Sequence, residues 1–515
     1  MIRRQSTERR FLFGLLGILL GAAAARFYHL GQPDFWLDEL HSLINSAGHR
    51  AEWEAFRPGE IITSRARFTE LDSTSTPTGV IRTMRHDAHP PVYFVLLNLW
   101  RRATGDGEAE VRTPSVFFSL AALLFTVLAV RHVAGDSAAL IAATISALQF
   151  TSVRMAQEAR PYALGMMFVS IAAWTVATAE RSWSSWSRHR RLVVCGVYTL
   201  SLLLSMLTHY FTAAALTALS MYAVVRFRGA QRWNFVAAIM ASAALWCVIW
   251  FDAWRDQLDF IAHQPWLQDG GDGWGVRLCS RLADLPFRML FSHEPFQSGV
   301  ASAAAGLVLF AGLSLATIRA PQRSGLLFAA WFGTPAIAFA VIDAVTGRQT
   351  LSHLRYTSMA APGLAAWMAC VFATIGPRAR AIVVTGMIGV MGVTLLPQLP
   401  TPRNPESRHA VEILREQAKP EDLLIINAIE WPEFWAGQLY LQINHYWPDM
   451  VADTLVLNAA PDPVVAREIA SRRRIITVTV PHRDAGEVIP SSHFRTWSSN
   501  YVEQIGFVRV FEAPR

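Results

Sequence analysis

The sequence predicts an all-α polytopic membrane protein with about 11 transmembrane helices and a C-terminal extracytoplasmic α/β domain. Three observations support this fold class. Of 515 residues, 52% are hydrophobic and only 17% are charged, which leaves too little polar surface for a soluble globule. Up to residue 397 the apolar residues form long windows near the about 20 residues that a helix needs to cross hydrocarbon. After residue 397 the chain becomes mixed in polarity.

The arginines give these windows an orientation. Arginine clusters precede the first window and follow the fourth, sixth, eighth and tenth, so a cytoplasmic N-terminus puts every cluster in a cytoplasmic loop. The first window also fits a signal peptide, since basic residues precede it and Ala22-Ala-Ala-Ala follows. The predicted spans are 11–28, 115–131, 137–153, 161–179, 192–209, 211–227, 233–251, 298–318, 325–344, 358–376 and 381–397.

The segment 91–102 is apolar but too short for a further span. At about 1.5 Å per residue its apolar part reaches about half of the hydrocarbon thickness. Counting it as a span would also move the arginines after the fourth window to the outside. We therefore expect a short helix on the outer membrane surface, within one external loop over 29–113 of a transmembrane domain that covers 1–397.

A soluble periplasmic α/β domain is predicted over 398–515. Prolines interrupt the apolar pattern from Pro397 onward, and Asn404-Pro405 is typical of a helix start. The amphipathic segment that follows predicts a helix to about Gln417. Strand-like runs follow at 423–427, 475–480 and 507–511, which indicates a small α/β fold.

Composition excludes several functions. The net charge of +7 rests on arginines, with Lys419 as the single lysine, and indicates no nucleic-acid partner. The four cysteines fall singly, so neither a disulfide framework nor a paired metal motif is predicted. The sequence has no P-loop and no dinucleotide-binding fingerprint.

Ionisable and aromatic residues of the predicted external loops gather at one membrane face. Such groups are costly at the hydrocarbon boundary unless they are paired or hydrated, so we expect a polar cavity that opens outward. Carboxylates there suit a general base or a metal ion, and arginines suit a phosphate group. The candidates are Asp38, Glu39, His89, Arg112, Glu158, Arg160, Tyr162, His209, His353, Arg355 and Tyr356.

Each candidate also has an ordinary structural explanation. Asp38 and Glu39 fit the first turn of a helix that continues through Leu43. Glu158 and Arg160 could pair with each other. Interfacial positions at the ends of spans would equally explain Arg160-Pro161, His209-Tyr210 and Arg355-Tyr356. The co-location of these residues, rather than any one of them, indicates a functional site.

Two other functional classes share this architecture. A transporter or flippase for lipids or glycolipids places ionisable or helix-breaking residues near the bilayer midplane and shows paired repeats. Here the charges gather at one face and no repeat is evident. A sensor or assembly protein would act through 398–515, which carries no motif of its own. An enzyme is therefore favoured, with a transporter as the alternative.

Five motifs together resemble those of the GT-C glycosyltransferases, and the resemblance covers nearly the whole chain. Within that group the sequence is similar to the dolichyl-phosphate-mannose protein mannosyltransferases and the bacterial aminoarabinose lipid A transferase. The motifs are Trp36-Leu-Asp-Glu, Asp87-Ala-His-Pro-Pro, Arg112-Thr-Pro-Ser, Gln157-Glu-Ala-Arg-Pro-Tyr and Arg355-Tyr.

This resemblance implies a GT-C fold and an enzyme of the bacterial inner membrane. Such an enzyme takes a sugar from a polyprenyl-phosphate carrier and passes it to a lipid, glycan or protein acceptor on the outer face. The first acidic residue of the Asp-Glu pair would be the catalytic base, which is Asp38 here. The second-loop carboxylate corresponds to Glu158 and the arginine before the second span to Arg112. The lipid A transferase has an acidic residue where this chain has His89, so its metal and phosphate contacts do not transfer directly.

The expected mechanism needs few groups, because a lipid phosphate is already a good leaving group. The protein must deprotonate an acceptor and stabilise charge on the departing phosphate. Asp38 suits the first task. Arg160 and Arg355, with Arg112, suit the second, since a guanidinium presents a planar fork to phosphate oxygens. A divalent cation could assist through Asp38, His89 or Glu158, although no ligand spacing requires one.

Overall fold

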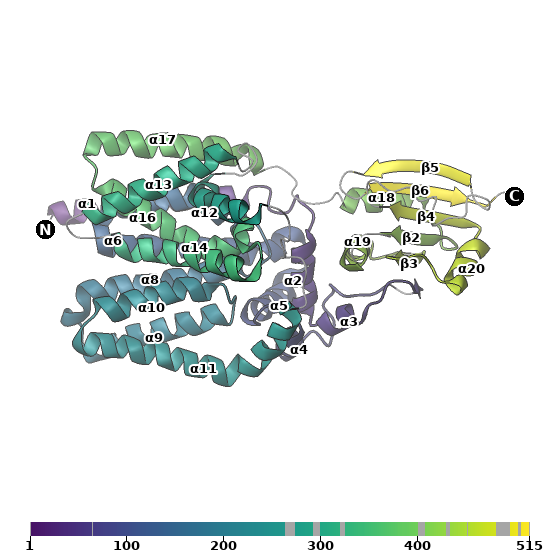
Figure 1. Cartoon of the computed structure of the whole chain (residues 1–515), viewed down its shortest axis with the longest axis horizontal. Helices are drawn as coiled ribbons and strands as arrows, with labels where there is room; N and C mark the ends of the chain where they lie inside the picture. Colours follow the sequence, from purple (N-terminus) through teal and green to yellow (C-terminus); the bar gives the residue numbers. More distant parts are fainter. Residues whose placement is uncertain are drawn as a thin grey trace. The chain divides into compact units, whose positions relative to one another are not determined.

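The computed structural model describes residues 2–63, 65–262, 273–291, 299–319, 325–399, 407–428, 433–450, 452–479, 495–502 and 506–513. The chain divides into two compact units (Figure 1). The helical unit comprises Met1–Leu30 and Met84–Thr401, and the α/β unit comprises Gly31–Thr83 and Pro402–Arg515.

The helical unit consists of long apolar helices joined by short connections (Figure 1). Helices are the expected form of these windows, because a helix satisfies its backbone hydrogen bonds within one segment, as hydrocarbon requires. The helices are α1 (Ile2–Phe27), α5 (Val92–Thr104), α6 (Glu108–Leu148), α7 (Phe150–Ala156), α8 (Tyr162–Ser182), α9 (Arg188–Met206), α10 (Thr212–Arg226), α11 (Gly229–Ala262), α12 (Trp274–Leu290), α13 (Val300–Arg319), α14 (Leu326–Thr346), α15 (Leu354–Thr357), α16 (Ala361–Ala373) and α17 (Pro377–Leu395), with short 3-10 turns at η1 (Met84–His86), η2 (Trp183–Ser185), η5 (Thr350–Ser352), η6 (Ser358–Ala360) and η7 (Leu396–Gln398).

Eight helices in the described part of the chain are long and apolar enough to cross a membrane. All of the predicted windows fall on helices. Two of the windows fall on helices outside this set of eight, and a third falls on a helix that another window already occupies. These three fall on the second half of α6, on α9 and on α10, which is apolar but shorter. The polytopic membrane architecture is confirmed, whereas the number of eleven spans stays a prediction.

Helix α6 covers two predicted spans because it consists of two helical segments, which meet at a backbone break at Gly135. Gly135 has a φ of 84°, in the left-handed region that glycine adopts without a steric penalty. The Arg131 guanidinium and the Asp136 carboxylate lie 2.7 Å apart across this turn. The break therefore stands between the windows 115–131 and 137–153, where the sequence predicts a loop.

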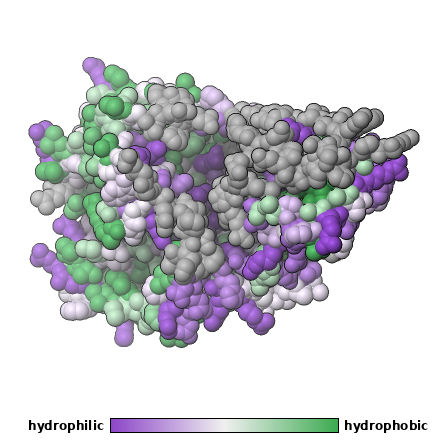
Figure 2. Space-filling view, turned by 45° about the vertical axis from the view of Figure 1, so that its right-hand side comes forward, coloured by the Kyte–Doolittle hydropathy of each residue, from purple (hydrophilic) through white to green (hydrophobic). Residues whose placement is uncertain are grey.

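The surface of the helical unit is apolar, as contact with hydrocarbon requires. Figure 2 shows apolar side chains gathered on the outside of its helices, and Val248, Val300 and Val345 are at least 80% exposed. Inside the unit the packing is close: Trp331 and Trp367 are buried, and a Cβ at Gly363 would lie only 2.8 Å from the Trp331 ring. A closely packed interior under an exposed apolar surface indicates that lipid covers this surface.

One buried arginine ties α1 to α6. Arg26 is fully buried, and its Nε donates to Ser119 Oγ at 2.9 Å. Its Nη1 donates to the carbonyls of Ala22 and Ala147 at 3.1 Å, and its Nη2 donates to the Ser146 carbonyl at 3.0 Å. The last two acceptors lie in the final turn of α6, where helix carbonyls have no partner within the helix.

Replacing Arg26 with methionine should destabilise the helical unit by about 2–3 kcal/mol. The substitution leaves buried carbonyl groups without their charged donor, while the methionine chain fills most of the vacated volume. Reversible unfolding in mixed micelles would measure the change in free energy. Arg10→Met is the matched control, because Arg10 lies on the same helix and is exposed. Equal stability of the two variants would contradict the proposed tie.

The short helix predicted near residues 91–102 is confirmed as α5, which runs from Val92 to Thr104. Its Trp100 Nε1 donates to the Glu110 carbonyl at the start of α6. Arg101 is buried on the same helix, and burial lowers its pKa although its pairing with Asp106 at 2.7 Å opposes this shift. The position of α5 on the outer membrane surface stays a prediction.

The α/β unit contains a six-stranded mixed sheet with the strand order β1-β3-β2-β4-β6-β5. The three central strands β3, β2 and β4 are parallel, and β1, β6 and β5 are antiparallel to their neighbours. The elements of this unit are α2 (Leu37–Ala47), α3 (Arg50–Ala55), β1 (Ile61–Ile62), α4 (Pro77–Thr83), α18 (Ser407–Gln417), β2 (Leu423–Asn427), α19 (Glu433–Tyr446), β3 (Asp453–Leu457), α20 (Pro463–Ser471), β4 (Arg474–Thr479), β5 (Arg495–Val502) and β6 (Gly506–Glu512).

The predicted α/β character of this unit is confirmed. The three predicted strands correspond to β2, β4 and β6, and the predicted helix ends at Gln417 as α18 does. The predicted helix start at Asn404-Pro405 lies outside the described residues. Strands β1, β3 and β5 and helices α19 and α20 were not predicted.

Residues 31–83 belong to the α/β unit, so the two compact units do not coincide with the predicted boundary after residue 397. The reason is a set of contacts that no local pattern reveals. Strand β1 pairs with β3, and the Asn444 amide donates to the Ala66 carbonyl at 2.8 Å. Arg65 Nε donates in turn to the Asn444 carbonyl at 3.0 Å. The segment that carries Asp38 thus folds around α19.

Candidate active site

Four connections of the helical unit supply its candidate polar site. They are the loop before α5, the α7–α8 turn, the α9–α10 turn and the segment before α16. They contribute His89, Arg160 with Tyr162, His209, and Arg355 with Tyr356, all of which were predicted from the sequence.

Asp87 orients His89 in the loop before α5. The Asp87 carboxylate accepts from the His89 backbone N–H at 2.9 Å and lies 2.7 Å from His89 Nδ1. Asp87 is buried, and His89 is half-buried. Two prolines follow, so the loop cannot continue its backbone hydrogen bonding, and the aspartate side chain holds the turn instead.

Arg160 defines the protonation of His89. The Nη2 atom of Arg160 lies 3.2 Å from His89 Nε2, and a guanidinium can only donate. Nε2 must therefore accept, which places the imidazole proton on Nδ1, where the Asp87 carboxylate accepts it. His89 is neutral in this arrangement. Asp87 fixes the orientation of the His89 ring, and the ring in turn fixes the position of the Arg160 guanidinium.

Arg160 is itself buried beside an aromatic ring. Only 4% of the residue is exposed, and its Cζ lies 5.7 Å from the centroid of the Tyr162 ring, within the range of a cation–π interaction. A buried guanidinium held by a histidine and a ring has a restricted orientation. This restriction suits the recognition of a fixed anionic group.

His209 lies in the turn between α9 and α10 and is buried next to this group. Its ring centroid is 5.4 Å from that of His89 and 5.3 Å from that of Tyr162. Its Nδ1 accepts from the Phe211 backbone N–H at 3.2 Å, so the neutral ring carries its proton on Nε2. Burial lowers the pKa of His209 well below its usual value, and the positive charge of Arg160 acts in the same direction. His209 is therefore a neutral hydrogen-bond donor.

Aromatic contacts bring the segment before α16 to the same place. The Phe211 ring lies 5.0 Å from the Tyr356 ring, and the His353 ring lies 5.5 Å from it. The Arg355 Cζ is 5.2 Å from the centroid of the Tyr356 ring. Phe211 thus connects the segment of His353, Arg355 and Tyr356 to the turn that carries His209. The sequence predicted that these residues lie close together.

Two charged residues from neighbouring helices hold the segment that leads to Arg355. Asp343 on α14 accepts the backbone N–H groups of Thr350 and Leu351 at 2.8 and 2.9 Å. Arg288 on α12 donates to the carbonyls of Leu351 and Ser352 at 2.9 and 3.3 Å. Donors and acceptors of one tight turn are thereby satisfied by side chains that were not predicted to contribute to the site.

Two predicted residues have clear structural partners in the helical unit. The Glu158 carboxylate is buried and pairs with Arg154 at 2.6 Å, one helical turn earlier. Arg112 is buried on α6, and its Nη1 donates to the Leu30 carbonyl at 2.9 Å. These contacts tie the α7–α8 turn and α6 to their surroundings, while the proposed roles of both residues in the reaction stay predictions.

Asp38 and Glu39 begin helix α2 of the α/β unit, as their predicted helix-start position requires. Both lie in the first helical turn, where the helix dipole stabilises carboxylates. Glu39 is buried and accepts from the Trp36 backbone N–H at 3.3 Å, whereas Asp38 is half-buried. The Phe35 backbone N–H donates to the Tyr446 hydroxyl at 2.5 Å, so α19 fixes the position at which α2 begins.

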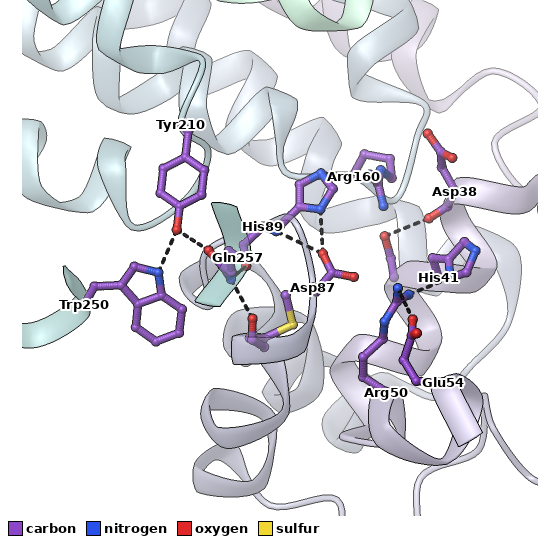
Figure 3. A network of polar contacts seen from close by, with 12 residues as sticks. Asp38, His41, Arg50, Glu54, Asp87, His89, Arg160, Tyr210, Trp250 and Gln257 are labelled. Atoms are coloured by element: carbon purple, nitrogen blue, oxygen red, sulfur yellow. Dashed lines mark hydrogen bonds and ion pairs between the residues drawn. The ribbon is translucent and has the colours of Figure 1, made fainter. Parts of the chain in front are cut away.

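His41, one turn after Asp38, is also held in a single tautomer (Figure 3). Arg50 Nη1 lies 3.2 Å from His41 Nδ1, so this nitrogen accepts and His41 Nε2 carries the proton. The Gln438 amide nitrogen lies 3.2 Å from His41 Nε2, and exchanging the positions of the amide nitrogen and oxygen lets the oxygen accept that proton. The Arg50 guanidinium also pairs with Glu54 at 2.5 Å.

The sequence interpretation missed the residues of α11 that support His89. Gln257 is fully buried, and its amide nitrogen donates to the carbonyls of Met84 and His89 (Figure 3). Polar residues such as Asp252 and Asp256 interrupt the apolar pattern near the end of α11, which was the available signal. No group of three His, Cys, Asp or Glu side chains suited to a metal ion occurs among the residues that the structure describes.

Comparison with known proteins gives matches in structure. No family model and no curated protein matches the sequence. The structure of ArnT from Cupriavidus metallidurans in the apo state matches with a TM-score of 0.58 at 12% sequence identity, over 98% of this chain and 100% of that chain. The same protein bound to undecaprenyl phosphate matches with a TM-score of 0.57 at 12% identity, over 97% of this chain and 99% of that chain.

A second solved structure has the same fold. The oligosaccharyltransferase of Archaeoglobus fulgidus in the apo form matches with a TM-score of 0.52 at 12% identity, over 91% of this chain and 69% of that chain. At such identities the similarity demonstrates a shared fold, and activity has to be inferred from the site.

Proposed function

We propose that this chain, which has the fold of the GT-C glycosyltransferases, transfers a hexosyl or pentosyl group from a polyprenyl-phosphate carrier to an acceptor. The observation that carries the proposal is the convergence of Arg160, His89, His209 and Tyr356 from four connections of the helical unit. A buried guanidinium beside neutral histidine rings offers positive charge and hydrogen-bond donors, which suits a phosphate group.

The phosphate of the carrier binds to arginine in this proposal. Arg160 is restricted by His89 and Tyr162, so little side-chain entropy remains to be lost when it binds an anion. His209 adds a neutral N–H donor, and Arg355 beside Tyr356 supplies a second guanidinium. The polyprenyl chain itself is hydrocarbon and fits the apolar surface that the membrane helices expose.

The reaction is a substitution at the anomeric carbon of the sugar. The acceptor oxygen or nitrogen forms a bond to this carbon, and the bond between the carbon and the phosphate oxygen breaks. Polyprenyl phosphate leaves with the electron pair, and the guanidinium groups stabilise its charge. Asp38 takes the proton of the acceptor and acts as the general base. Glu39 and Glu158 are proposed to support this step, and no nucleotide is consumed.

The alternative of a transporter is less well supported by the placement of the polar groups. His89, Arg160 and His209 lie in connections between helices, whereas transporters place such groups on broken helices near the bilayer midplane. We further propose a bacterial inner membrane location with a cytoplasmic N-terminus and a periplasmic C-terminal domain. Reporter fusions to the two termini would test this topology.

Mass spectrometry of envelope glycolipids and glycoproteins from a deletion strain would test the function. We expect the loss of one hexose, pentose or aminosugar from one class of molecule, restored by the intact gene. The purified protein should then release undecaprenyl phosphate from an undecaprenyl-phosphate sugar when that acceptor is added. An unchanged envelope in the deletion strain would contradict a transferase.

Asp87→Asn should reduce sugar transfer about 10- to 100-fold with little loss of stability. Asparagine has the size of aspartate, but its amide can donate to His89 Nδ1, which favours a proton on Nε2. That proton would face the Arg160 guanidinium, so two donors would oppose each other. Steady-state kinetics with the purified enzyme would measure the effect, and we expect it mainly in KM for the donor. Asp449→Asn, at an exposed position of the α/β unit, is the control; equal kinetics of both variants would contradict the tautomer assignment.

A further inference from the structure

A chain of hydrogen bonds between α11 and the α9–α10 turn leads to the loop of His89 (Figure 3). Trp250 Nε1 donates to the Tyr210 hydroxyl at 2.8 Å, and this hydroxyl donates to the Gln257 amide oxygen. The Gln257 amide nitrogen then donates to the Met84 carbonyl at 2.6 Å and to the His89 carbonyl at 2.9 Å. The chain has one direction, because the indole N–H can only donate and both backbone carbonyls can only accept.

The loop before α5 depends on this chain for its shape. Pro90 and Pro91 have no backbone N–H, so the loop cannot pair its own carbonyls in a regular turn. One amide nitrogen of Gln257 joins the carbonyl of Met84 to that of His89 across the loop. Both Gln257 and Trp250 are buried, so water does not replace a lost bond at low cost.

The same chain also holds the second connection of the site. Tyr210 directly follows His209, and burial raises the pKa of its hydroxyl, which keeps it protonated as a donor. The Tyr210–Gln257 bond thus joins the His209 turn to the His89 loop. Since His89 Nε2 accepts from Arg160 at 3.2 Å, movement of either connection would change the direction of the guanidinium.

We propose that Gln257 and Tyr210 are positioning residues, which hold the His89 loop and the His209 turn in the register that directs Arg160 toward a phosphate group. This role rests on the proposed binding of a polyprenyl phosphate. Neither residue touches the phosphate. A glutamate at position 257 cannot serve, because its carboxylate would face two carbonyls and has no proton to donate at neutral pH.

Binding of undecaprenyl phosphate to the full-length protein in detergent is the experiment. Tyr210→Phe and Gln257→Glu should weaken this affinity about tenfold or more, and Trp250→Phe should weaken it less, because the chain remains anchored at Tyr210. Gln231→Glu is the matched control: Gln231 lies on the same helix, and its amide donates to the Ala179 carbonyl at 3.0 Å at a different part of the unit. It should affect thermal stability and leave the affinity unchanged.

A second substitution separates positioning from general stability. If Tyr210 acts through His89, Tyr210→Phe should change the affinity less than twofold in a His89→Ala background. Additive effects of the two substitutions, or an unchanged affinity in Tyr210→Phe and Gln257→Glu, would overturn the positioning role alone. Absence of binding by the wild-type protein would overturn the proposed function, and this role with it.

Discussion

Replacement of Asp38 with asparagine is expected to lower sugar transfer about 10²- to 10⁴-fold, the range in which a general base contributes to catalysis. Asparagine keeps the size and the helix-start preference of aspartate, but it cannot accept the proton of the acceptor. Because Asp38 is half-buried in the first turn of α2, the change of charge should cost little stability. We therefore expect a loss in kcat with KM for the donor nearly unchanged.

Release of undecaprenyl phosphate from an undecaprenyl-phosphate sugar would measure this effect with purified protein. Glu52→Gln is the matched control, because Glu52 is exposed on the short helix α3 of the same unit and loses the same charge. The control should transfer sugar at the wild-type rate. Full activity of Asp38→Asn in a correctly folded protein would remove Asp38 from the mechanism and favour a non-catalytic role for the chain.

Arg160→Ala is expected to weaken donor binding about 100-fold or more. A charge-assisted hydrogen bond contributes about 1.5–3 kcal/mol, and Arg160 is buried where water screens little. Arg160→Lys should recover part of this loss, because lysine keeps the charge but not the planar fork that contacts two oxygens. The difference between the two variants would separate charge from geometry.

Donor KM and the affinity for undecaprenyl phosphate would both be measured for these variants. Arg188→Ala removes an exposed arginine at the start of α9 and is the control for the loss of positive charge. We expect wild-type affinity for this control. Equal affinities in Arg160→Ala, Arg188→Ala and the wild type would show that the phosphate is bound elsewhere.

Much of the fold was predictable from apolar patterns alone. All eleven windows fall on helices, and β2, β4 and β6 occupy the predicted strand-like runs. Such patterns are local: an apolar window in hydrocarbon has few alternatives to a helix. The place of 31–83 was not predictable, because it depends on the pairing of β1 with β3, which brings together residues nearly 400 positions apart.

The candidate site was predictable in its residue types and only partly in its contacts. The expectation that His89, Arg160, Tyr162 and His209 come together is met by the described contacts. From the sequence alone, a pair between Glu158 and Arg160 was the ordinary explanation of both residues. In the structure the Glu158 carboxylate pairs with Arg154 instead. Both arginines lie close in sequence, so only the direction of the α7–α8 turn separates the two possibilities.

By itself the sequence determined that this protein is built from membrane helices and an α/β unit, and which ionisable side chains stand at the ends of those helices. Both follow from local transfer free energies, which depend on the residue and its neighbours along the chain. Only the tertiary structure decided that Gln257 holds the His89 loop and that His89 accepts from Arg160. A hydrogen bond depends on the angle at the donor and on a donor–acceptor distance within a few tenths of an ångström. Buried groups reach this geometry only when distant helices pack together.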